Sequence, residues 1–531
     1  MPRILCALGA SLCNHRSTRV TDTDVLIVGA GPTGLVLALW LARLGVRVRV
    51  VDKAAEPGTT SRALVVHART LEFYRQIGLA AGVVERGLKF ASVNLWVKGR
   101  QIAHIVFGAM GRGISAFPYM LIFPQDEHER LLTDRLREAG VEIERPVELV
   151  HFDDRGDRVV ARLQMADGGE ATCEAAYVAG CDGAHSKVRE VLGCSFPGGT
   201  YAHMFYVADA EASGAIVNHE LHVALDQADF VAAFPLQGDG HVRLIGIVRE
   251  NAAHDKLGWD DVSRGVIERL GVVVARINWF STYHVHHRVV SKFRQGRAFL
   301  LGDAAHIHSP VGGQGMNTGI GDAVNLAWKL AQVLQSRIHA RVLDTYEPER
   351  IAFAQRLVAT TDRGFQIVTS DGPLARFVRL QVVPRVLPPL FASETMRRFM
   401  FRTVSQTAIE YRDSALSQGS AGGIRAGDRL PWVRFGDGED DNYAPLKIID
   451  WQAHVYGEAP AAISQICRAR GIALHAFPWR DAFGGAGFER NAVYLVRPDG
   501  YVALADTARA SEKLERYLDA WAVRPRPVPS T

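Results

Sequence analysis

The sequence predicts an α/β protein: a parallel βαβ domain, an antiparallel sheet inserted into it, a helical segment and a small C-terminal α/β domain. A glycine-rich turn joins two short apolar strands near the N-terminus, and short alternating segments replace that pattern from about residue 197 to 290. A strand–helix–strand pattern resumes after a Gly/Ser-rich break near residue 420. The predicted boundaries are 22–196 with 291–365 for the first domain, 197–290 for the inserted sheet, 366–420 for the helical segment and 421–531 for the last domain.

The first organised segment is a βαβ unit of about 30 residues. Val25–Val28 has the pattern of a buried strand and ends at glycine. Leu35–Leu44 is almost wholly apolar, which predicts a buried helix that Gly45 can end. Val46–Val51 is the second strand, so we expect a right-handed crossover between the two.

The turn of this unit has the pattern of a dinucleotide-binding motif. Gly29 permits the tight turn, Gly31 lets a pyrophosphate approach the backbone, and Gly34 lets the helix pack close to the sheet. Asp52 ends the second strand, where a carboxylate accepts hydrogen bonds from ribose hydroxyls, and Lys53 beside it is grouped with the cofactor-binding residues. The motif does not choose between NAD and FAD, and a purely structural turn is the remaining alternative.

Residues 1–21 precede this unit and contain one Arg followed by a short apolar stretch, a layout shared with secretory signal peptides. We expect a disordered leader instead, because the segment that follows looks like an intracellular domain. The six cysteines contain no C-x-x-C pair, which favours a reducing cytoplasm. Net charge is +4 without a long basic block, which excludes an obvious nucleic-acid surface, and no apolar run reaches the roughly 18–20 residues of a membrane span.

The remaining elements follow in the order that this fold class requires. Residues 416–423 are Gly/Ser-rich and predict a linker, and the chain after them reads as strand, helix, strand, a strand pair with a Pro-Asp-Gly turn, and a last helix. Helices are predicted at 68–77, 127–138 and 316–334, mainly helical chain at 343–368 and 374–405, and strands at 159–165, 171–179 and 298–301.

Two further motifs each join a strand to a helix. The first, YVAGCDGAHSKVRE, contains Asp182, Gly183, Ser186 and Arg189, and on its own it also fits an Asp-Gly turn with Ser186 near a helix cap. The second, LLGDAAHIHSPVGGQG, places Gly302 and Asp303 after a strand and ends in a glycine-rich loop before a long helix.

These three motifs, in this order and spacing, resemble those of the single-component FAD-dependent aromatic hydroxylases, the flavoprotein monooxygenases of the para-hydroxybenzoate hydroxylase and phenol hydroxylase type. The resemblance runs from about residue 24 to 363, and SRALVVHARTLEFYRQIGL and LDTYEPERIAFAQRLV fit it as well. The segment GIRAGDRLPWV resembles the entry to the thioredoxin-like C-terminal domain of the larger members, although the redox C-x-x-C is absent here. A structural role, in stability or dimer contacts, is therefore expected for that domain.

The resemblance implies FAD as the cofactor and assigns several residues to it. Asp303 would bind the ribityl or pyrophosphate part, Arg62 would face the phosphates, and Gln125 would contact the ribityl chain. Asp182 would hold the FAD loop and contribute to where a nicotinamide cofactor engages, while Gly302 precedes the Asp303 carboxylate.

The resemblance also places the flavin ring against the glycine-rich loop at 310–315, here called the glycine loop. Backbone N–H groups of Gly315, Met316 and Asn317 would point at the N1–C2=O edge, where negative charge gathers on reduction, and Pro310 would line the ring beside the substrate. A 2-His-1-carboxylate iron site made with His306 and His308 is the sharper alternative. We expect no metal, because the family explains this loop without one.

The implied reaction is a monooxygenation in which NADPH or NADH binds transiently, reduces the flavin, and O₂ adds at its C4a position as a hydroperoxide. Hydroxylation of a small aromatic substrate, phenolic or polyketide-like, is expected. Baeyer–Villiger oxidation or epoxidation on the same fold is one alternative, and a non-catalytic FAD-fold binding protein is another. A homodimer stays open.

The sequence does not identify a catalytic base. The inserted sheet should supply the substrate pocket, and we predict that it is lined by aromatic or polar residues that ordinary sheet packing would also explain. These candidates are Phe205, His222, Phe230 and Phe234.

Overall fold

The computed structural model describes the chain from residue 20 to residue 526 with short gaps. The predicted leader residues 1–19, Arg62 and Pro310 lie outside the described part. The described ranges are 20–58, 63–90, 92–106, 110–225, 230–248, 257–262, 264–309, 311–369, 372–435, 441–507 and 510–526.

The first sheet has the βαβ unit at its centre. Strand β1 (Val20–Val28) pairs in parallel with β2 (Val48–Val51) and with β11 (Glu170–Gly180). Residues 20 and 21, which the sequence placed in a leader, therefore begin β1, because they continue its pairing with β11. The strand order is β17-β18-β11-β1-β2-β8, with β10 and β9 added antiparallel to β11. The other bounds are β8 Ile143–Glu144, β9 Glu148–Asp154, β10 Val159–Gln164, β17 Arg294–Gln295 and β18 Ala298–Leu300.

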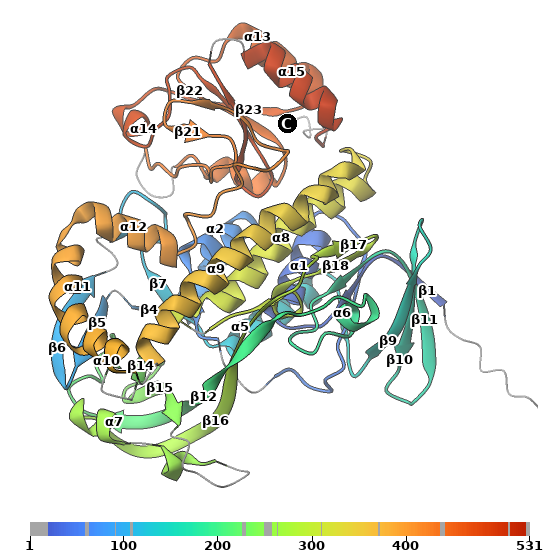
Figure 1. Ribbon diagram of the computed structural model, residues 1–531. Coiled ribbons are helices and arrows are strands. Elements are labelled where there is room, and N and C mark those ends of the chain that lie inside the picture. The colour runs from blue at the N-terminus through green and yellow to red at the C-terminus, as the bar shows by residue number, and fades with distance from the viewer. Residues whose placement is uncertain are drawn as a thin grey trace, which may run out of the picture.

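Helix α1 (Pro32–Arg43) is packed against α5 (Gln125–Glu138) and α8 (Gln314–Leu334). Its residues 34–41 are all buried, as expected for a helix that is apolar on every face. Figure 1 shows α8 and α9 running side by side as the longest helices of this half. The other elements around the first sheet are α2 Ala68–Gln76, α3 Ala80–Arg86, α6 Lys187–Val191, the three-residue helices η2 Gly302–Ala304 and η3 Val311–Gly313, η4 Ala340–Thr345, α9 Tyr346–Thr369, and a small sheet of β3 Val65–Val66, β7 Met120–Ile122 and β4 Leu88–Phe90.

The second sheet is larger than the predicted insertion 197–290. Two strands from the segment assigned to the first domain, β5 (Ser92–Val97) and β6 (Arg100–Val106), complete one edge of it, because β5 pairs in parallel with β13 (Leu221–Leu225). At the other edge β19 (His306–Ile307) pairs with the end of β16 (Val273–Val289). The order is β19-β16-β12-β15-β14-β13-β5-β6, with β12 Gly198–Ser213, β14 Phe230–Pro235 and β15 His241–Val248.

The two faces of this sheet pack against different neighbours, as the two-residue period of strands requires. One face carries Tyr206, Val231 and Leu244 and packs against the short helix α7 (Gly265–Arg269) and the 3₁₀ turn η1 (Trp259–Asp261). The opposite face faces the first domain and a helical segment, and contributes Leu221, Val223 and Phe234 to a shared apolar cluster.

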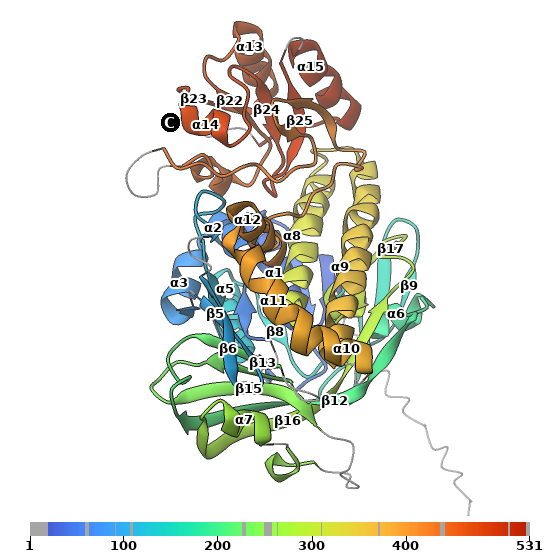
Figure 2. The ribbon, with the colours of Figure 1, turned by 60° about the vertical axis from the view of Figure 1, so that its left-hand side comes forward.

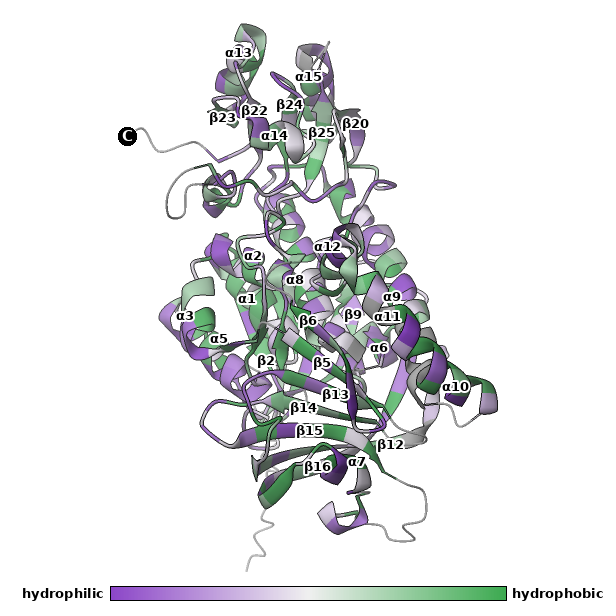
Figure 3. Ribbon diagram, turned by 90° about the vertical axis from the view of Figure 1, so that its left-hand side faces the viewer, coloured by the Kyte–Doolittle hydropathy of each residue, from purple (hydrophilic) through white to green (hydrophobic). Residues whose placement is uncertain are grey.

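The helical segment lies over the β5–β6 edge of the second sheet (Figure 2). It consists of α10 (Pro373–Phe377), a π-helix (Val378–Val382), α11 (Val383–Ala392) and α12 (Glu394–Val404). The hydropathy colouring in Figure 3 shows both hydrophobic and hydrophilic residues along α10–α12. Phe391 and Phe401 are buried in the cluster shared with Phe234, so these helices close one side of the space between the two sheets. None of the helices among the described residues is both long and apolar enough to cross a membrane.

The C-terminal domain forms a six-stranded sheet in the order β21-β20-β25-β24-β22-β23. Residues 416–423 are not a linker: β20 (Gln418–Ala421) lies in this sheet, parallel to β25 (Val502–Asp506), and Leu416 is fully buried. A side chain at Gly419 would overlap the carbonyl of Ala505, so the Gly-rich composition reflects close strand approach. The thioredoxin-like assignment stays a prediction. The other bounds are β21 Ile424–Arg425, the 3₁₀ turn η6 Ala444–Ile448, β22 Gln452–Tyr456, α13 Ala461–Arg470, β23 Ala473–Phe477, α14 Asp481–Gly485, β24 Val493–Val496 and α15 Ala510–Trp521.

Candidate functional site

The three sequence motifs meet at one edge of the first sheet. Strand pairing places Val28 beside Gly180 and Gly180 beside Leu300, so the loops that follow β1, β11 and β18 leave the sheet together. A side chain at Gly29 would overlap the carbonyl of Cys181. Ligands of parallel α/β sheets bind at this carboxyl edge, so the motif residues converge where a cofactor is expected.

The N-terminus of α1 has the form of an anion site. Gly31 is its N-cap, no described side chain caps it, and a Cβ at Gly31 would meet no protein atom within 4 Å. A Cβ at Gly34, by contrast, would overlap the carbonyl of Gly29. The glycines therefore have separate roles: Gly34 permits close packing, whereas Gly31 faces open space at the positive end of a helix, where a pyrophosphate fits.

Asp52 lies at the end of β2 and is anchored to the glycine turn. Its carboxylate accepts hydrogen bonds from the backbone N–H of Ala30 at 2.7 Å and of Ala54 at 2.8 Å. Arg145 forms an ion pair with it at 3.1 Å, a partner that sequence reasoning missed because Arg145 follows a different strand, β8. Lys53 is exposed beside this pair.

Asp182 binds the start of α6, whose N-cap is Ser186, as the structural alternative for this motif expected. Its Oδ2 accepts the backbone N–H groups of Lys187 at 2.6 Å and Val188 at 3.1 Å, and Oδ1 accepts the Ser186 hydroxyl at 2.5 Å. Burial raises the pKa of Asp182. A cofactor contact through this carboxylate stays a prediction, since the described contacts all serve α6.

The same motif is nevertheless tied to the Gly302 loop. Arg189 donates from Nη1 to the carbonyl of Ala304 at 3.0 Å and from Nη2 to that of Ala184 at 2.7 Å. The second and third motifs are thus held together by one arginine.

Close backbone packing shapes the start of the third motif. Gly302 has φ +57°, and a Cβ there would lie 2.7 Å from Oγ1 of Thr33 in the first motif. A Cβ at Gly319 in α8 would overlap the same hydroxyl and lie 3.1 Å from Cα of Gly302. Asp303, next in the chain, is exposed at this edge. Its predicted contact with FAD is compatible with that position and stays a prediction.

Asp322 of α8 holds the loop that begins at Gly302, and sequence reasoning missed this residue. Its Oδ2 accepts the Gly302 N–H at 3.0 Å and pairs with Nε2 of His306 at 2.7 Å, while Oδ1 accepts Nε of Arg350 at 2.6 Å. Burial favours the neutral acid, but Arg350 and then His306 hold the pKa of Asp322 below its ordinary value. The available signal was an acidic residue inside a mainly apolar helical stretch, IGDAVNLA.

The two loop histidines serve different contacts and do not converge with Asp303. His306 pairs with Asp322, whereas His308 donates from Nδ1 to the carbonyl of Ser309 at 2.9 Å. Burial lowers the pKa of His308 to about 4, so its ring is neutral near neutral pH. In the described part of the chain, no group of three or more His, Cys, Asp or Glu side chains is placed to hold a metal ion.

Helix α8 begins beneath the glycine loop. Its N-cap is Gly313, and no described side chain caps it. The Asn317 side chain accepts from the backbone N–H of His67 at 2.9 Å and donates to the carbonyls of Val65 at 2.8 Å and Gly313 at 2.9 Å. Asn317 therefore fastens the helix start to the β3–α2 connection.

The neighbours of Asn317 leave the helix start accessible in part. Gly315 and Met316 are half-buried at the first turn. Gln125, at the start of α5, accepts the N–H of Ala63 at 3.2 Å and donates to Glu129 at 2.8 Å. The predicted cofactor contacts of these residues stay predictions.

His67 is a second residue that sequence reasoning passed over. It is fully buried beside Gly312 and Gly313 at the glycine loop, and burial lowers its pKa to about 4. The backbone of Gly312 and of Gly313 opposes that shift in part. A neutral imidazole thus lies next to the loop.

The four predicted substrate residues divide between the two faces of the second sheet. Phe205 and Phe230 belong to one small aromatic cluster, and Phe234 lies on the same face in the cluster shared with α11 and α12. His222 is on the other face, where it accepts from Trp96 at 3.1 Å and pairs with Asn218 at 2.8 Å. The structure does not bring His222 together with the three phenylalanines, because alternate residues of a strand point to opposite faces.

The face that carries Phe205 has a stripe of rings leading to the glycine loop, here called the aromatic stripe: Tyr201, Phe205, Tyr283 and His287. Phe205 and Tyr283 have ring centroids 6.1 Å apart, and Tyr201 and His287 4.8 Å. The stripe leads on to Val289, which pairs with His306 of β19. Tyr283 and His287 could have been found from the period-two spacing in YHVHH.

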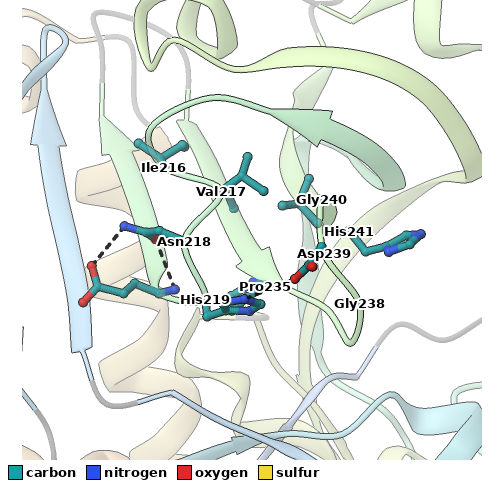
Figure 4. Close-up of a pocket in the computed structure, with 12 residues that line it drawn as sticks. Ile216, Val217, Asn218, His219, Pro235, Gly238, Asp239, Gly240 and His241 are labelled. Carbon is teal, nitrogen blue, oxygen red and sulfur yellow. Dashed lines mark hydrogen bonds and ion pairs between the residues drawn. The ribbon is translucent and has the colours of Figure 1, made fainter.

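A cavity of about 210 Å³ opens elsewhere, at the hairpin end of the second sheet (Figure 4). Asn218 lines it and is hydrogen-bonded to Glu220, while His219 faces Asp239 at 3.9 Å. Strand ends and hairpin residues near Ala233 line this cavity. The Ala233 side chain belongs to the face of the sheet opposite the aromatic stripe. It is therefore separate from the site at the glycine loops.

Comparison with known proteins agrees with this geometry. The family model described as FAD binding domain matches residues 22–361. The 6-methylpretetramide 4-monooxygenase of Streptomyces rimosus is 38% identical over 526 residues, covering 94% of this chain and 93% of that protein. The 12-dehydrotetracycline 5-monooxygenase/anhydrotetracycline 6-monooxygenase of Streptomyces rimosus subsp. rimosus is 31% identical over 508 residues, covering 90% and 94%. The solved structure of the anhydrotetracycline hydroxylase OxyS from Streptomyces rimosus superposes with a TM-score of 0.75 at 28% identity, covering 94% and 99%.

Proposed function

The chain belongs to the FAD binding domain family and is an FAD-dependent monooxygenase; we propose that it places one oxygen atom from O₂ on a polycyclic aromatic substrate of the polyketide type. The observation that carries the substrate class is the 38% identity to the pretetramide monooxygenase over nearly the whole of both chains. That similarity includes the second sheet, from which a substrate pocket would be built.

The residues at the sheet edge fit FAD. Open space at Gly31 faces a helix N-terminus that suits the pyrophosphate, and the Asp52 carboxylate suits the adenosine ribose. Arg145 holds Asp52 in place from the adjacent strand end. We propose that Gln125 and Asp303 bind the central ribityl part, since both lie on loops and helix starts at the same edge.

Bound FAD, reduced by NADH or NADPH, supplies the electrons and the activated oxygen for the hydroxylation. The protein's own contribution begins at α8, whose N-terminus directs backbone N–H groups toward the loop and favours negative charge there. Asp322 of α8 and His306 keep the Gly302 loop fixed close to this helix.

The aromatic stripe would position the substrate. Tyr283 is half-buried and can stack or pack edge-to-face with a planar ring, while the fully buried Phe205 supports it, which suits a fused-ring compound better than a small polar one. The helices α11 and α12 close the remaining side with Phe391 and Phe401, which keeps water out.

The test is turnover with flavin occupancy measured in parallel. Purified protein should be yellow, oxidise NADH or NADPH faster when a naphthacene-type phenol is added, and yield a product heavier by one oxygen atom. A flavin-loaded protein that gains no oxidation rate with any fused-ring phenol, but does with single-ring phenols, would contradict the substrate class. A colourless protein that takes up no FAD would contradict the function itself.

We further propose that the enzyme is a cytoplasmic homodimer. The four described cysteines, Cys173, Cys181, Cys194 and Cys467, are all free thiols, which supports a reducing compartment. Exposed apolar side chains on α10 and α12, among them Leu374 and Phe399, would be covered by a second copy. Sedimentation velocity tests this: a single species at the monomer mass would contradict the dimer.

A further inference from the structure

A buried cluster of charges joins the C-terminal domain to helices α8 and α9. Arg497, just before the turn between β24 and β25, donates from Nη1 and Nη2 to the two carboxylate oxygens of Glu349 at 2.8 and 3.0 Å. Asp499 accepts from Arg497 at 2.6 Å and from the Trp328 indole at 3.0 Å. Lys329 donates to Glu349 at 2.8 Å, and the four charged side chains are at most 1% exposed.

This cluster is linked through Tyr411 to the loop after β18 that contains Gly302 and Asp303, here called the cofactor loop. The guanidinium of Arg497 lies 5.3 Å from the centroid of the Tyr411 ring, and the Tyr411 hydroxyl accepts Nη1 of Arg350 at 2.8 Å. Arg350 directly follows Glu349 in α9, so one helical turn faces both the C-terminal domain and the cofactor loop.

The link ends at the Gly302 motif. Arg350 donates from Nε to Asp322 at 2.6 Å, and Asp322 holds the Gly302 N–H at 3.0 Å and His306 at 2.7 Å. A Cβ at Gly321 would lie only 3.1 Å from Nη2 of Arg350, so the guanidinium fits its place closely. Every step is a buried, direct contact, and a buried charge keeps its position only while its partners stay in place.

We propose that Tyr411 and Arg497 are positioning residues of the FAD site. They fix Arg350, Arg350 fixes Asp322, and Asp322 holds Gly302 and His306 under the cofactor. The C-terminal domain, which contains no C-x-x-C, thereby forms part of the support of the flavin loop. This inference rests on the binding of FAD at that loop.

If Tyr411 and Arg497 had a purely structural role, their contacts would matter for folding and not for FAD binding. The distinction is possible because Arg75 and Asp441, a partly buried ion pair at 2.6 Å, also join α2 to the C-terminal domain. No described contact links that pair to Asp322. Loss of either pair should loosen the same interface, but only the Arg497 route continues through Tyr411 and Arg350 to Asp322 under Gly302.

The mildest test removes one hydroxyl. Tyr411→Phe deletes the acceptor of Arg350, and Tyr517→Phe is the matched control, because Tyr517 is also buried and its hydroxyl donates to the Leu416 carbonyl at 2.9 Å. Both variants should lower the melting temperature of the apoprotein similarly. We expect Tyr411→Phe to raise the Kd for FAD about 10-fold, as loss of a supporting hydrogen bond does in other sites, and Tyr517→Phe to leave it within about 2-fold.

The flavin midpoint potential is a second readout, since a displaced Asp322 changes the charge near the loop. It should shift in Tyr411→Phe and stay at the wild-type value in Tyr517→Phe. Equal Kd and equal potential in the two variants would overturn the inference while leaving the function intact. A wild type that takes up no FAD would overturn both.

A second pair keeps the test decisive if Tyr411→Phe does not fold. Arg497→Lys retains the charge but loses the two-pronged contact with Glu349, and Arg75→Lys retains the charge of the pair with Asp441 but loses the guanidinium. We expect about a 10-fold weaker FAD affinity only for Arg497→Lys. The same affinity in both lysine variants would refute the positioning role.

Discussion

The Asp322 carboxylate in α8 lies 2.7 Å from Nε2 of His306 in β19, and both side chains are at most 1% exposed. The same carboxylate holds the backbone N–H of Gly302 and the guanidinium of Arg350. One buried acid therefore joins the cofactor loop, the edge of the second sheet and the long helix α9. Its removal should be felt first at the cofactor.

Asp322→Asn should weaken FAD binding by about 10- to 100-fold, because an amide leaves Arg350 without its buried counter-charge and can serve His306 and Gly302 only in part. Flavin fluorescence during titration measures the Kd. Asp344→Asn is the control, since Asp344 forms an ion pair with Arg294 but is 70% exposed. Unchanged affinity in Asp322→Asn would contradict this arrangement.

Two glycines of the first motif should respond differently to alanine. In Gly31→Ala the new methyl group meets no protein atom within 4 Å, so the apoprotein should keep its melting temperature while FAD affinity falls. In Gly34→Ala the methyl group would overlap the Gly29 carbonyl, so apoprotein stability and affinity should both fall. Thermal unfolding with and without FAD separates the two. If Gly31→Ala bound FAD like the wild type, the pyrophosphate would not lie at this helix end.

The position of Phe205 and His222 on opposite faces predicts opposite effects on substrate binding. Phe205→Ala should raise KM for a fused-ring substrate about 10-fold, because the buried Phe205 ring supports Tyr283 of the aromatic stripe, with FAD affinity unchanged. His222→Ala should leave KM unchanged and lower stability, because it breaks hydrogen bonds to Trp96 and Asn218. Steady-state kinetics at saturating NADPH provides the comparison, and a raised KM in His222→Ala alone would reverse the assignment.

Buried neutral histidines predict a loss of stability in mild acid. Burial lowers the pKa of His67 and of His308 to about 4 and of His128 to about 3. Below pH 6.5 the unfolded chain takes up protons that the folded chain does not, so the free energy of unfolding falls with pH by about 1.4 kcal/mol per unit and histidine. This holds from pH 6.5 down to the folded pKa values.

His128 is the residue to change for this test, because it is not among the predicted cofactor-binding residues and its one described side-chain hydrogen bond is with the Tyr74 hydroxyl, at 2.8 Å. His128→Gln should show a smaller difference in unfolding free energy between pH 7 and pH 5 than the wild type. Urea denaturation at the two pH values measures it. An equal difference in both proteins would show that His128 is protonated in the folded state.

Sequence reasoning reached the elements that short-range pattern defines. The β1–α1–β2 unit was predicted from an apolar run, a GxGxxG turn and a second apolar run, and the structure contains it. The FAD binding domain family is confirmed. Helix α8 was also predicted, since its apolar period continues over more than five turns.

Several assignments could not come from local pattern. The pairing of β5 with β13 joins residues more than 120 positions apart, and strand partners at that distance leave no trace in either segment alone. The glycine-rich residues 416–423 have a linker's composition, yet close approach to β25 is what requires glycine there. The side of the sheet on which His222 lies depended on the strand register, because a slip of one residue moves every side chain of a strand to the opposite face.

The sequence by itself determined the dinucleotide-binding turn after the first strand, and the resemblance of its three motifs to a known family indicated FAD, because glycines at fixed spacing between an apolar strand and an apolar helix form a local pattern. Which side chains support the FAD site was decided only by the fold. The supporting side chains come from separate segments that meet at or behind the loops after β1, β11 and β18. They are Asp322, Arg145, Tyr411 and Arg497. A buried charge is tolerated only where partners from elsewhere in the chain surround it, so its role cannot be read until those partners are in place.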